Sequence, residues 1–159
     1  MIVISDSSSL IAIGAVGQLE LLRSLYGEVI VPPAVWNEVT TPNRPGANAV
    51  KQASWIRVVP VSNPMAAGQL PSPVGRGEAE AIALAIELSA DVLLIDERRA
   101  RKAALGLGLP VTGVLGLLLE AKKRGSISAI KPILDQMETT VAFRLKRSLY
   151  DAALRAAGE

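Results

Sequence analysis

The sequence predicts an α/β fold, a three-layer α/β/α sandwich in which a central, mostly parallel sheet of about five strands lies between two layers of helices. Short runs rich in Val and Ile alternate along the chain with longer segments of helical periodicity. These short runs lack polar residues at alternate positions, which is typical of strands that are buried on both faces of a sheet. The chain has 159 residues and is 50% hydrophobic, so one domain spanning residues 1–159 is expected.

Five segments have the length and composition of buried strands. In chain order they are Ile2–Ser5, Val29–Val31, Ile56–Val59, Val92–Ile95 and the short Pro110–Thr112. Because helical segments separate them, we expect the strands to run parallel and to be joined by helices.

Eight helices are predicted from apolar periodicity and from residues that favour helix ends. They cover Leu10–Val16, Gln18–Leu25, Ala34–Thr40, Glu78–Leu88, Glu97–Leu105, Gly113–Arg124, Ile127–Met137 and Leu145–Ala157. Ser7–Ser9 offer caps for the first helix, and Pro32 and Pro33 suit the opening of the third. The segment Pro60–Gly77 contains four prolines and is expected to form a long loop over one edge of the sheet.

The chain contains neither cysteine nor histidine. Disulfides, thiolate nucleophiles, Ser-His triads and zinc sites built from Cys or His are therefore excluded. The opening MIVISDSSSL lacks the basic region of a signal peptide, and the most apolar later run is too short to span a bilayer. We expect a cytoplasmic protein with no membrane association, whose reactive groups are carboxylates, hydroxyls and cations.

Two aspartates directly follow predicted strands: Asp6 comes after the first and Asp96 after the fourth. Ligands of open parallel sheets bind outside the carboxyl ends of the strands, so these two side chains are expected to converge. Glu38, in the helix after the second strand, and Glu78, at the start of the helix before the fourth, can reach the same rim. Each acid alone also fits a helix cap, a first-turn acid or a surface residue. The combination is what predicts a site.

Carboxylates that are packed together repel one another and take up protons unless a cation holds them ionised. Hard divalent ions prefer oxygen ligands, so acids without nitrogen or sulfur ligands favour Mg²⁺ or Mn²⁺ over zinc. One ion or two would activate water for attack on a phosphodiester and stabilise the charge that develops.

Charge is distributed unevenly along the chain. Residues 1–97 hold five basic and ten acidic side chains, a net charge of −5, whereas residues 98–159 hold twelve and five, a net charge of +7. This asymmetry predicts an acidic site beside a basic rim that binds a polyanion, although solvated helix faces would give the same count. Arg98 and Arg99 lie next to Asp96 and are candidate phosphate ligands.

Four stretches of the sequence resemble the PIN domain family, particularly its VapC-like toxin ribonucleases. They are IVISDSSSLI, VPPAVWNEV, GEAEAIALAIELSADVLLIDERRAR and LPVTGVLGLLLEAKKRG. The resemblance reaches to about residue 125, and the C-terminal helices from about residue 126 are less diagnostic. It implies a PIN-like fold and a Mg²⁺- or Mn²⁺-dependent endoribonuclease that acts on RNA. It also implies a toxin of a toxin–antitoxin pair, a homodimer, and an antitoxin protein that inserts into the site.

Position by position, the resemblance assigns the catalytic and metal-binding roles to four acids, which are Asp6, Glu38, Glu78 and Asp96 in that order. Ser8 stands where the family has a small polar residue that supports the first acid, and with Arg98 and Arg99 it is a candidate substrate contact.

The sequence departs from the family pattern in three places near these acids. One is the absence of the aromatic residue often found shortly after Asp96, where Arg98 and Arg99 stand. The third acid is a glutamate rather than the usual aspartate, and Glu80 competes with Glu78 for its role. Leu94 stands where the family has a hydroxyl residue two positions before Asp96. These departures leave open a non-catalytic PIN-fold module that binds RNA or a protein and has a decayed metal site.

Two other classes of protein also place an acid after their first strand. A response-regulator receiver needs a phosphoacceptor aspartate after a middle strand, but Pro60 follows Ile56–Val59. A phosphatase of the haloacid-dehalogenase type needs a second aspartate two residues after the first, where Ser8 stands. Both classes are therefore rejected.

Overall fold

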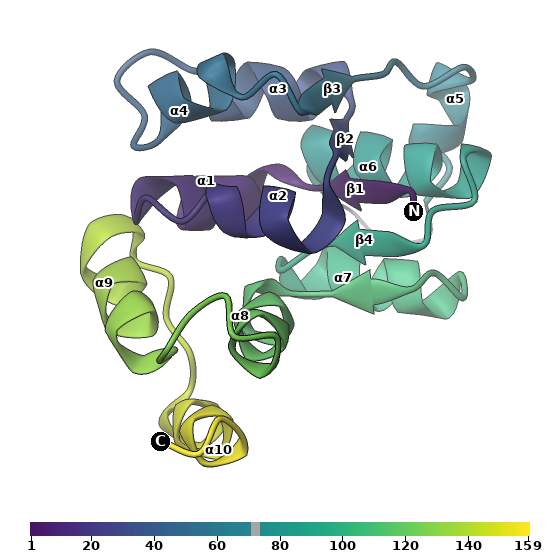
Figure 1. Cartoon of the computed structure of the whole chain (residues 1–159). Helices are drawn as coiled ribbons and strands as arrows, with labels where there is room; N and C mark the ends of the chain where they lie inside the picture. The colour runs from purple at the N-terminus through teal and green to yellow at the C-terminus, as the bar shows by residue number, and fades with distance from the viewer. Residues whose placement is uncertain (71–73) are drawn as a thin grey trace.

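The fold is built on a five-stranded, all-parallel sheet with the strand order β3-β2-β1-β4-β5 (Figure 1). It is seen in a computed structural model that describes residues 1–70 and 74–159. The strands are β1 (Val3–Ser5), β2 (Val29–Val31), β3 (Ile56–Val58), β4 (Val92–Leu94) and β5 (Val111–Thr112). The predicted sandwich is confirmed, and every predicted strand is present with each end shifted by at most one residue.

Helices cover both faces of this sheet. In chain order they are α1 (Ser7–Ala15), α2 (Glu20–Tyr26), α3 (Pro33–Val39), α4 (Ala47–Gln52), α5 (Pro64–Ala67), α6 (Arg76–Glu87), α7 (Arg98–Gly106), α8 (Val114–Lys123), α9 (Lys131–Val141) and α10 (Arg147–Ala156). In Figure 1, α1, α2 and α8 lie in front of the sheet, and α6 and α7 lie behind it. The helix α3 packs against both α1 and α6, α9 against α1, and α10 against α8. Across the described residues, no helix is both long and apolar enough to cross a membrane.

Two of these helices lie where the sequence predicted none. The helix α4 follows Gly46, whose φ of 81° is left-handed and whose backbone passes so close to α1 that an added Cβ would lie 2.6 Å from the carbonyl carbon of Gly14. The helix α5 lies within Pro60–Gly77, so the prediction of one long loop there was wrong in part. Asn63 caps α5, and Pro64 occupies a first-turn position where proline is tolerated. Residues 71–73 of the same segment lie outside the described residues.

The central strand β1 marks the point where the chain changes direction across the sheet. One neighbour of β1 is β2, and the other is β4. The connections that leave the carboxyl ends of β1 and β4 therefore diverge to opposite sides, since β1 leads to β2 and β4 leads to β5. Such a divergence creates the crevice in which open α/β sheets bind their ligands.

Candidate active site

Asp6 follows β1 and ends the hydrogen-bonded ladder between β1 and β4. Its backbone N–H donates to the carbonyl of Leu94 at 2.9 Å, and its side-chain Oδ2 accepts from the backbone N–H of Asp96 at 3.2 Å. Its Oδ1 accepts from the N–H of Ser9 at 2.9 Å, which makes Asp6 the N-cap of α1. From the sequence, Asp6 could be either the N-cap of a helix or a metal ligand. The cap is present, and a second role is compatible with it because each carboxylate oxygen keeps a further lone pair.

Asp96 lies beyond the end of β4 and is held by α1 and α8. Its Oδ2 accepts from the hydroxyl of Ser9 at 3.0 Å and from the N–H of Val114 at 2.9 Å. Its Oδ1 lies beside Gly113, where an added Cβ would be only 2.6 Å away. The cap of α7 is Glu97 and not Asp96. The Asp96 carboxylate is thereby directed to the crevice between β1 and β4.

Ser9 joins the two aspartates, because its N–H binds Asp6 and its hydroxyl binds Asp96. Ser9 is fully buried, whereas Ser8, the residue to which the family pattern gives the supporting role, is exposed. Sequence reasoning did not single out Ser9. The available signal was its position three residues after a helix cap, where the backbone N–H is one that a capping side chain binds.

Burial raises the pKa of both aspartates. Asp6 is 0% exposed, and this burial raises its pKa from 3.8 to about 7, with a smaller contribution from the charge of Asp96 and with its hydrogen bonds acting in the opposite direction. Burial also raises the pKa of Asp96, against the hydrogen bonds from Val114 and Ser9 and the nearby charge of Arg101. Two adjacent carboxyl groups in this state bind a proton or a cation readily.

Glu38 extends from α3 toward α1 and α6. A Cβ added to Gly77 would lie 2.6 Å from Oε1 of Glu38 and 2.9 Å from Oγ of Ser7, so both oxygens lie against the same glycine. Ser7 is 3% exposed, and its hydroxyl lacks a hydrogen-bond partner among the described residues. A buried polar atom of this kind, next to a carboxylate, offers an oxygen to a bound ion or substrate.

Glu78 and Glu80, the rivals for the third acid, lie in different surroundings. The carboxylate of Glu78 folds over Gly75 in the first turn of α6. One oxygen of Glu80 accepts from the N–H of Ala34 at 3.0 Å, and the other lies 3.5 Å from Nε of Arg76. Because Glu80 binds the first turn of α3, Glu78 is the better candidate for the third acid.

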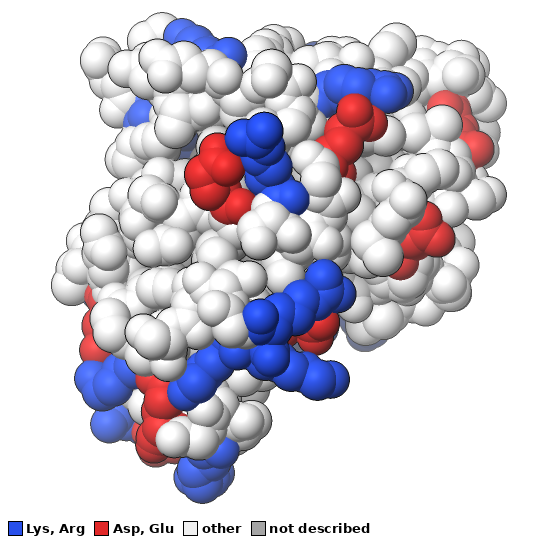
Figure 2. All heavy atoms as spheres, in the orientation of Figure 1, with Lys and Arg blue, Asp and Glu red and all other residues white. Residues whose placement is uncertain are grey.

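Asp96 lines a hollow of about 510 Å³ between α7, α8 and the segment that joins α9 to α10. Arg98 and Arg101 line this hollow, whereas Arg99 is exposed on α7 outside its lining. Figure 2 shows Lys and Arg side chains gathered where α8 and α10 lie on the face that it displays. The cations that the structure places beside Asp96 are Arg98, Arg101 and Arg144, which line the same hollow.

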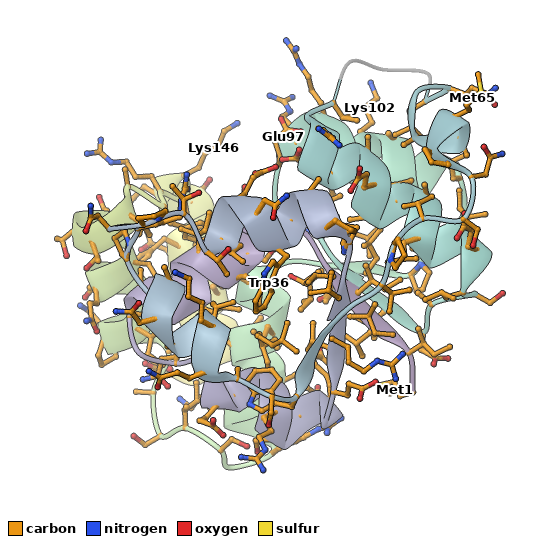
Figure 3. The ribbon with its side chains drawn as sticks, turned by 90° about the horizontal axis from the view of Figure 1, so that it is seen from above. Met1, Trp36, Met65, Glu97, Lys102 and Lys146 are labelled. Carbon is orange, nitrogen blue, oxygen red and sulfur yellow. The ribbon has the colours of Figure 1, made fainter. Side chains whose placement is uncertain are left out.

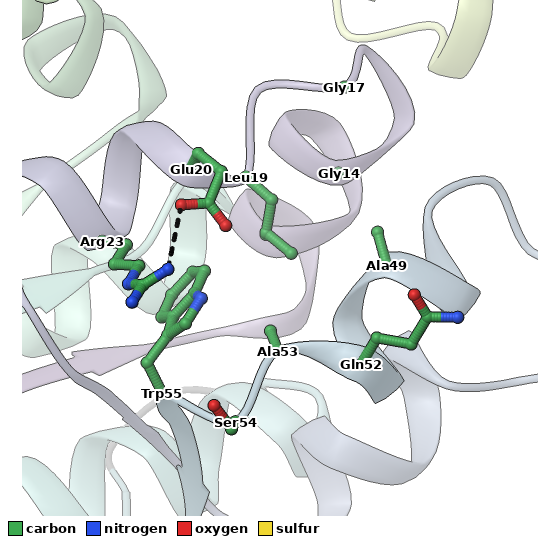
Figure 4. Close-up of a pocket in the computed structure, with 10 residues that line it drawn as sticks. All are labelled: Gly14, Gly17, Leu19, Glu20, Arg23, Ala49, Gln52, Ala53, Ser54 and Trp55. Carbon is green, nitrogen blue, oxygen red and sulfur yellow. Dashed lines mark ion pairs between the residues drawn. The ribbon is translucent and has the colours of Figure 1, made fainter.

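Another hollow, of about 380 Å³, lies beside the opposite end of α1 (Figure 4). Gly14 of α1, Trp55 and an ion pair between Glu20 and Arg23 line it. It contains none of the four predicted acids. The carboxyl ends of β1 and β4, and not this hollow, form the candidate active site.

The family of the chain follows from a comparison with known proteins. A family model described as PIN domain matches residues 2–159, nearly the whole chain. The chain belongs to the PIN domain family. PIN domains are generally nucleases, which places the chain in a class of hydrolases, and PIN nucleases typically use divalent metals. A comparison with curated proteins found no match.

In this PIN domain the predicted acids are gathered in two groups. Asp6 and Asp96 share Ser9, whereas Glu38 lies against Gly77 of α6 and Glu78 against the glycine that precedes this helix. Within residues 1–70 and 74–159, no three carboxylates form a ready cluster for a metal ion. The donor chemistry nevertheless fits a hard divalent cation, since it consists of carboxylates and a buried hydroxyl without a partner.

Proposed function

We propose that this PIN domain is a metal-dependent endoribonuclease that hydrolyses phosphodiester bonds of RNA. In this proposal Asp6 and Asp96 hold Mg²⁺ or Mn²⁺, and Glu38 and Glu78 complete the site. The observation that carries the proposal is the pairing of Asp6 and Asp96 through Ser9 at the point where the sheet connections diverge.

A bound divalent cation would supply activation of water and stabilisation of the charge that develops on the phosphate. The residues of the chain position and tune this chemistry. Ser9 and Val114 fix the orientation of the Asp96 carboxylate. Asp6 has a pKa of about 7, so its carboxyl group gives up its proton when a cation binds in the place of that proton. Arg98 attracts the RNA backbone to the hollow beside Asp96.

The resemblance to VapC-like ribonucleases extends the proposal to the biological setting. We propose that the chain is a cytoplasmic toxin that forms a homodimer and is inhibited by an antitoxin protein. Co-purification followed by a cleavage assay tests this part of the proposal. A protein encoded beside the chain should co-purify with it and abolish its cleavage of RNA. A chain that cleaves RNA and binds no such partner would remain a ribonuclease but not a toxin of this type.

A second candidate function is a non-catalytic PIN-fold module that binds RNA or a protein. One observation favours it: among residues 1–70 and 74–159, no three carboxylates form a group that could hold a metal ion. Such a module would bind its ligand equally well with and without a divalent ion.

The deciding experiment is cleavage of a mixed RNA pool by the purified protein with Mn²⁺, with Mg²⁺ and with EDTA. We expect cleavage only when a metal is present. Asp6→Asn should lower the cleavage rate by more than about a hundredfold, which is a larger loss than is typical for a residue that only supports a metal ligand. Arg57→Ala, which changes an exposed arginine paired with Glu28, is the control. No cleavage, or cleavage that is indifferent both to EDTA and to Asp6→Asn and so does not come from this site, would move the assignment to the binding module. Circular RNA as substrate separates endonuclease from exonuclease.

The same assay distinguishes the two rivals for the third acid. Glu78→Gln should lower the cleavage rate about tenfold or more, whereas Glu80→Gln keeps an acceptor for the Ala34 N–H and should cleave at nearly the normal rate. The reverse pattern would assign the catalytic role to Glu80.

A further inference from the structure

We infer that the hollow beside Asp96 is a subsite for one unpaired nucleotide of single-stranded RNA, whose base packs against Phe143 while its flanking phosphates contact Arg98, Arg101 and Arg144. The inference rests on the proposed ribonuclease function, because Asp96 is what relates the subsite to the cleaved bond. It adds the place of a nucleotide subsite in the fold and the residues that form it.

The inner wall of the hollow is apolar. Leu115 and Leu119 of α8 contribute to it, together with Phe143, Leu145 and Leu149 from the C-terminal part of the chain. Phe143 is the only phenylalanine in the sequence, and Leu149 is 48% exposed. A volume of about 510 Å³ is in the range of small-molecule sites, and an aromatic ring in an apolar wall is the surface on which unstacked bases pack.

The rim of the hollow is cationic. Arg98 and Arg101 come from α7, and Arg144 comes from the segment between α9 and α10. Across the part of the chain that the structure describes, no carboxylate oxygen lies within 4.0 Å of these three guanidinium groups, whereas Arg57 and Arg124 have such partners. Arg101 lies near enough to Asp96 for its charge to lower the pKa of that carboxyl group. Guanidinium groups that form no ion pair are suited to phosphate, because the planar group donates two parallel hydrogen bonds to it.

The segment that carries Phe143 and Arg144 is turned toward the hollow by the end of α9. Ala142 ends this helix with a left-handed φ of 53°, and the N–H of Phe143 donates to the carbonyl of Met137 at 3.3 Å. In Figure 3, Glu97 and Lys146, the sequence neighbours of Arg98 and Leu145, project on the same side of the molecule. Residues from α7 and from the C-terminal segment thus meet at one surface, as the shared lining of the hollow shows.

The combination of features favours single-stranded RNA over a duplex or a protein segment. A base that enters the hollow must be unpaired and unstacked, so a duplex is excluded from it. Because Asp96 is part of the wall, a nucleotide bound here places an adjoining phosphate at the aspartate pair.

Binding can be measured without cleavage in the Asp6→Asn background. The probe is a fluorescein-labelled RNA decamer of mixed sequence, single-stranded or annealed to its complement, titrated by fluorescence anisotropy at several salt concentrations. Phe143→Leu keeps an apolar side chain but removes the aromatic face, Arg144→Ala removes one cation, and Arg57→Ala is the matched control for loss of a charge.

We expect the single strand to bind more tightly than the duplex. Phe143→Leu should weaken binding of the single strand about tenfold with an unchanged salt dependence. Arg144→Ala should weaken it and reduce the slope of log K against log salt by about 1, and Arg57→Ala should change neither. Equal binding of duplex and single strand, or variants at Phe143 and Arg144 that behave like Arg57→Ala, would overturn the subsite.

The outcomes separate this inference from the proposed function. Metal-dependent cleavage that is indifferent to Phe143→Leu and Arg144→Ala leaves the ribonuclease in place and removes the subsite. Binding that depends on both residues, without any cleavage, supports the subsite and removes the ribonuclease. A hollow that accepts a protein segment instead would leave RNA binding unchanged in both variants, which overturns the inference.

Discussion

The carboxyl group of Asp6 is fully buried, and burial raises its pKa from 3.8 to about 7. Between these two values the folded protein holds a proton that the unfolded chain has released. The free energy of unfolding that this group contributes is therefore fully present below about pH 4 and is lost as the pH rises through 7.

Asp6→Asn should remove this pH dependence, since the amide cannot ionise. Between pH 5 and pH 8 the wild type should lose about 3 kcal/mol in free energy of unfolding that the variant keeps, because each of the two pH units below the folded pKa of about 7 corresponds to about 1.4 kcal/mol. Urea unfolding in EDTA at both pH values measures the difference. Glu138→Gln, at an exposed acid of α9, serves as the control. If Asp6→Asn and the wild type lose stability in parallel, Asp6 is already ionised in the folded protein at pH 5.

Ser9 is the second residue whose role can be isolated. Ser9→Ala keeps the N–H that binds Asp6 but loses the hydroxyl that binds Asp96, at a cost of about 1 kcal/mol in stability. Because that hydrogen bond lowers the pKa of Asp96, its loss should raise this pKa further. We expect a cleavage rate about tenfold lower and an acidic limb of the pH–rate profile that moves to higher pH. Ser8→Ala, at the exposed neighbour, should show neither change. If the pH–rate profile of Ser9→Ala is the same as that of the wild type, Ser9 has a purely structural role.

At the scale of elements, the strands and the two strand-end aspartates could be predicted because they depend on local signals. Apolar runs of strand length identify the strands, and parallel strands bring their carboxyl ends to one edge. The contacts of Glu38 and Asp96 with Gly77 and Gly113 could not be predicted, because they arise where separate helices meet. The helix α5 was missed because four prolines in one segment outweighed the capping signal of Asn63. The family resemblance, rather than periodicity, is what singled out Glu38.

Gly77 allows a test of how α6 and α3 are placed relative to each other. Gly77→Ala should not weaken the helix, since alanine is favoured over glycine in helices by about 1 kcal/mol. Its methyl group would, however, occupy the space of the Glu38 carboxylate and press on Ser7. We expect a protein that is at least as stable and cleaves RNA about tenfold more slowly.

Gly106→Ala is the matched control, because an added Cβ there meets no atom within 4 Å. It should leave the cleavage rate unchanged. Equal rates in both alanine variants would show that the position of Glu38 beside Gly77 has no part in the reaction.

For the whole molecule, the site joins β1, β4, α1 and α8, so a cation bound there should stabilise the entire fold. Mn²⁺ at 100 times its dissociation constant adds about 2.7 kcal/mol. In a protein of this size that raises the Tm by several degrees, about 2–4 °C per kcal/mol. Differential scanning fluorimetry should show the shift in the wild type and not in Asp6→Asn, and EDTA should reverse it. A Tm that rises equally in Asp6→Asn would place the bound cation elsewhere.

The position of β1 in the middle of the sheet also governs when the site can exist during synthesis. β1 is made before its neighbour β4, and Asp96 is held in place only once the N–H of Val114 is available. Nascent chains that end before α8 therefore contain all four acids but cannot hold the Asp96 carboxylate as the complete fold does. Contacts between segments so far apart in sequence form late and slowly. Most of this polypeptide is thus synthesised before the Asp96 carboxylate can take the position that it has in the complete fold.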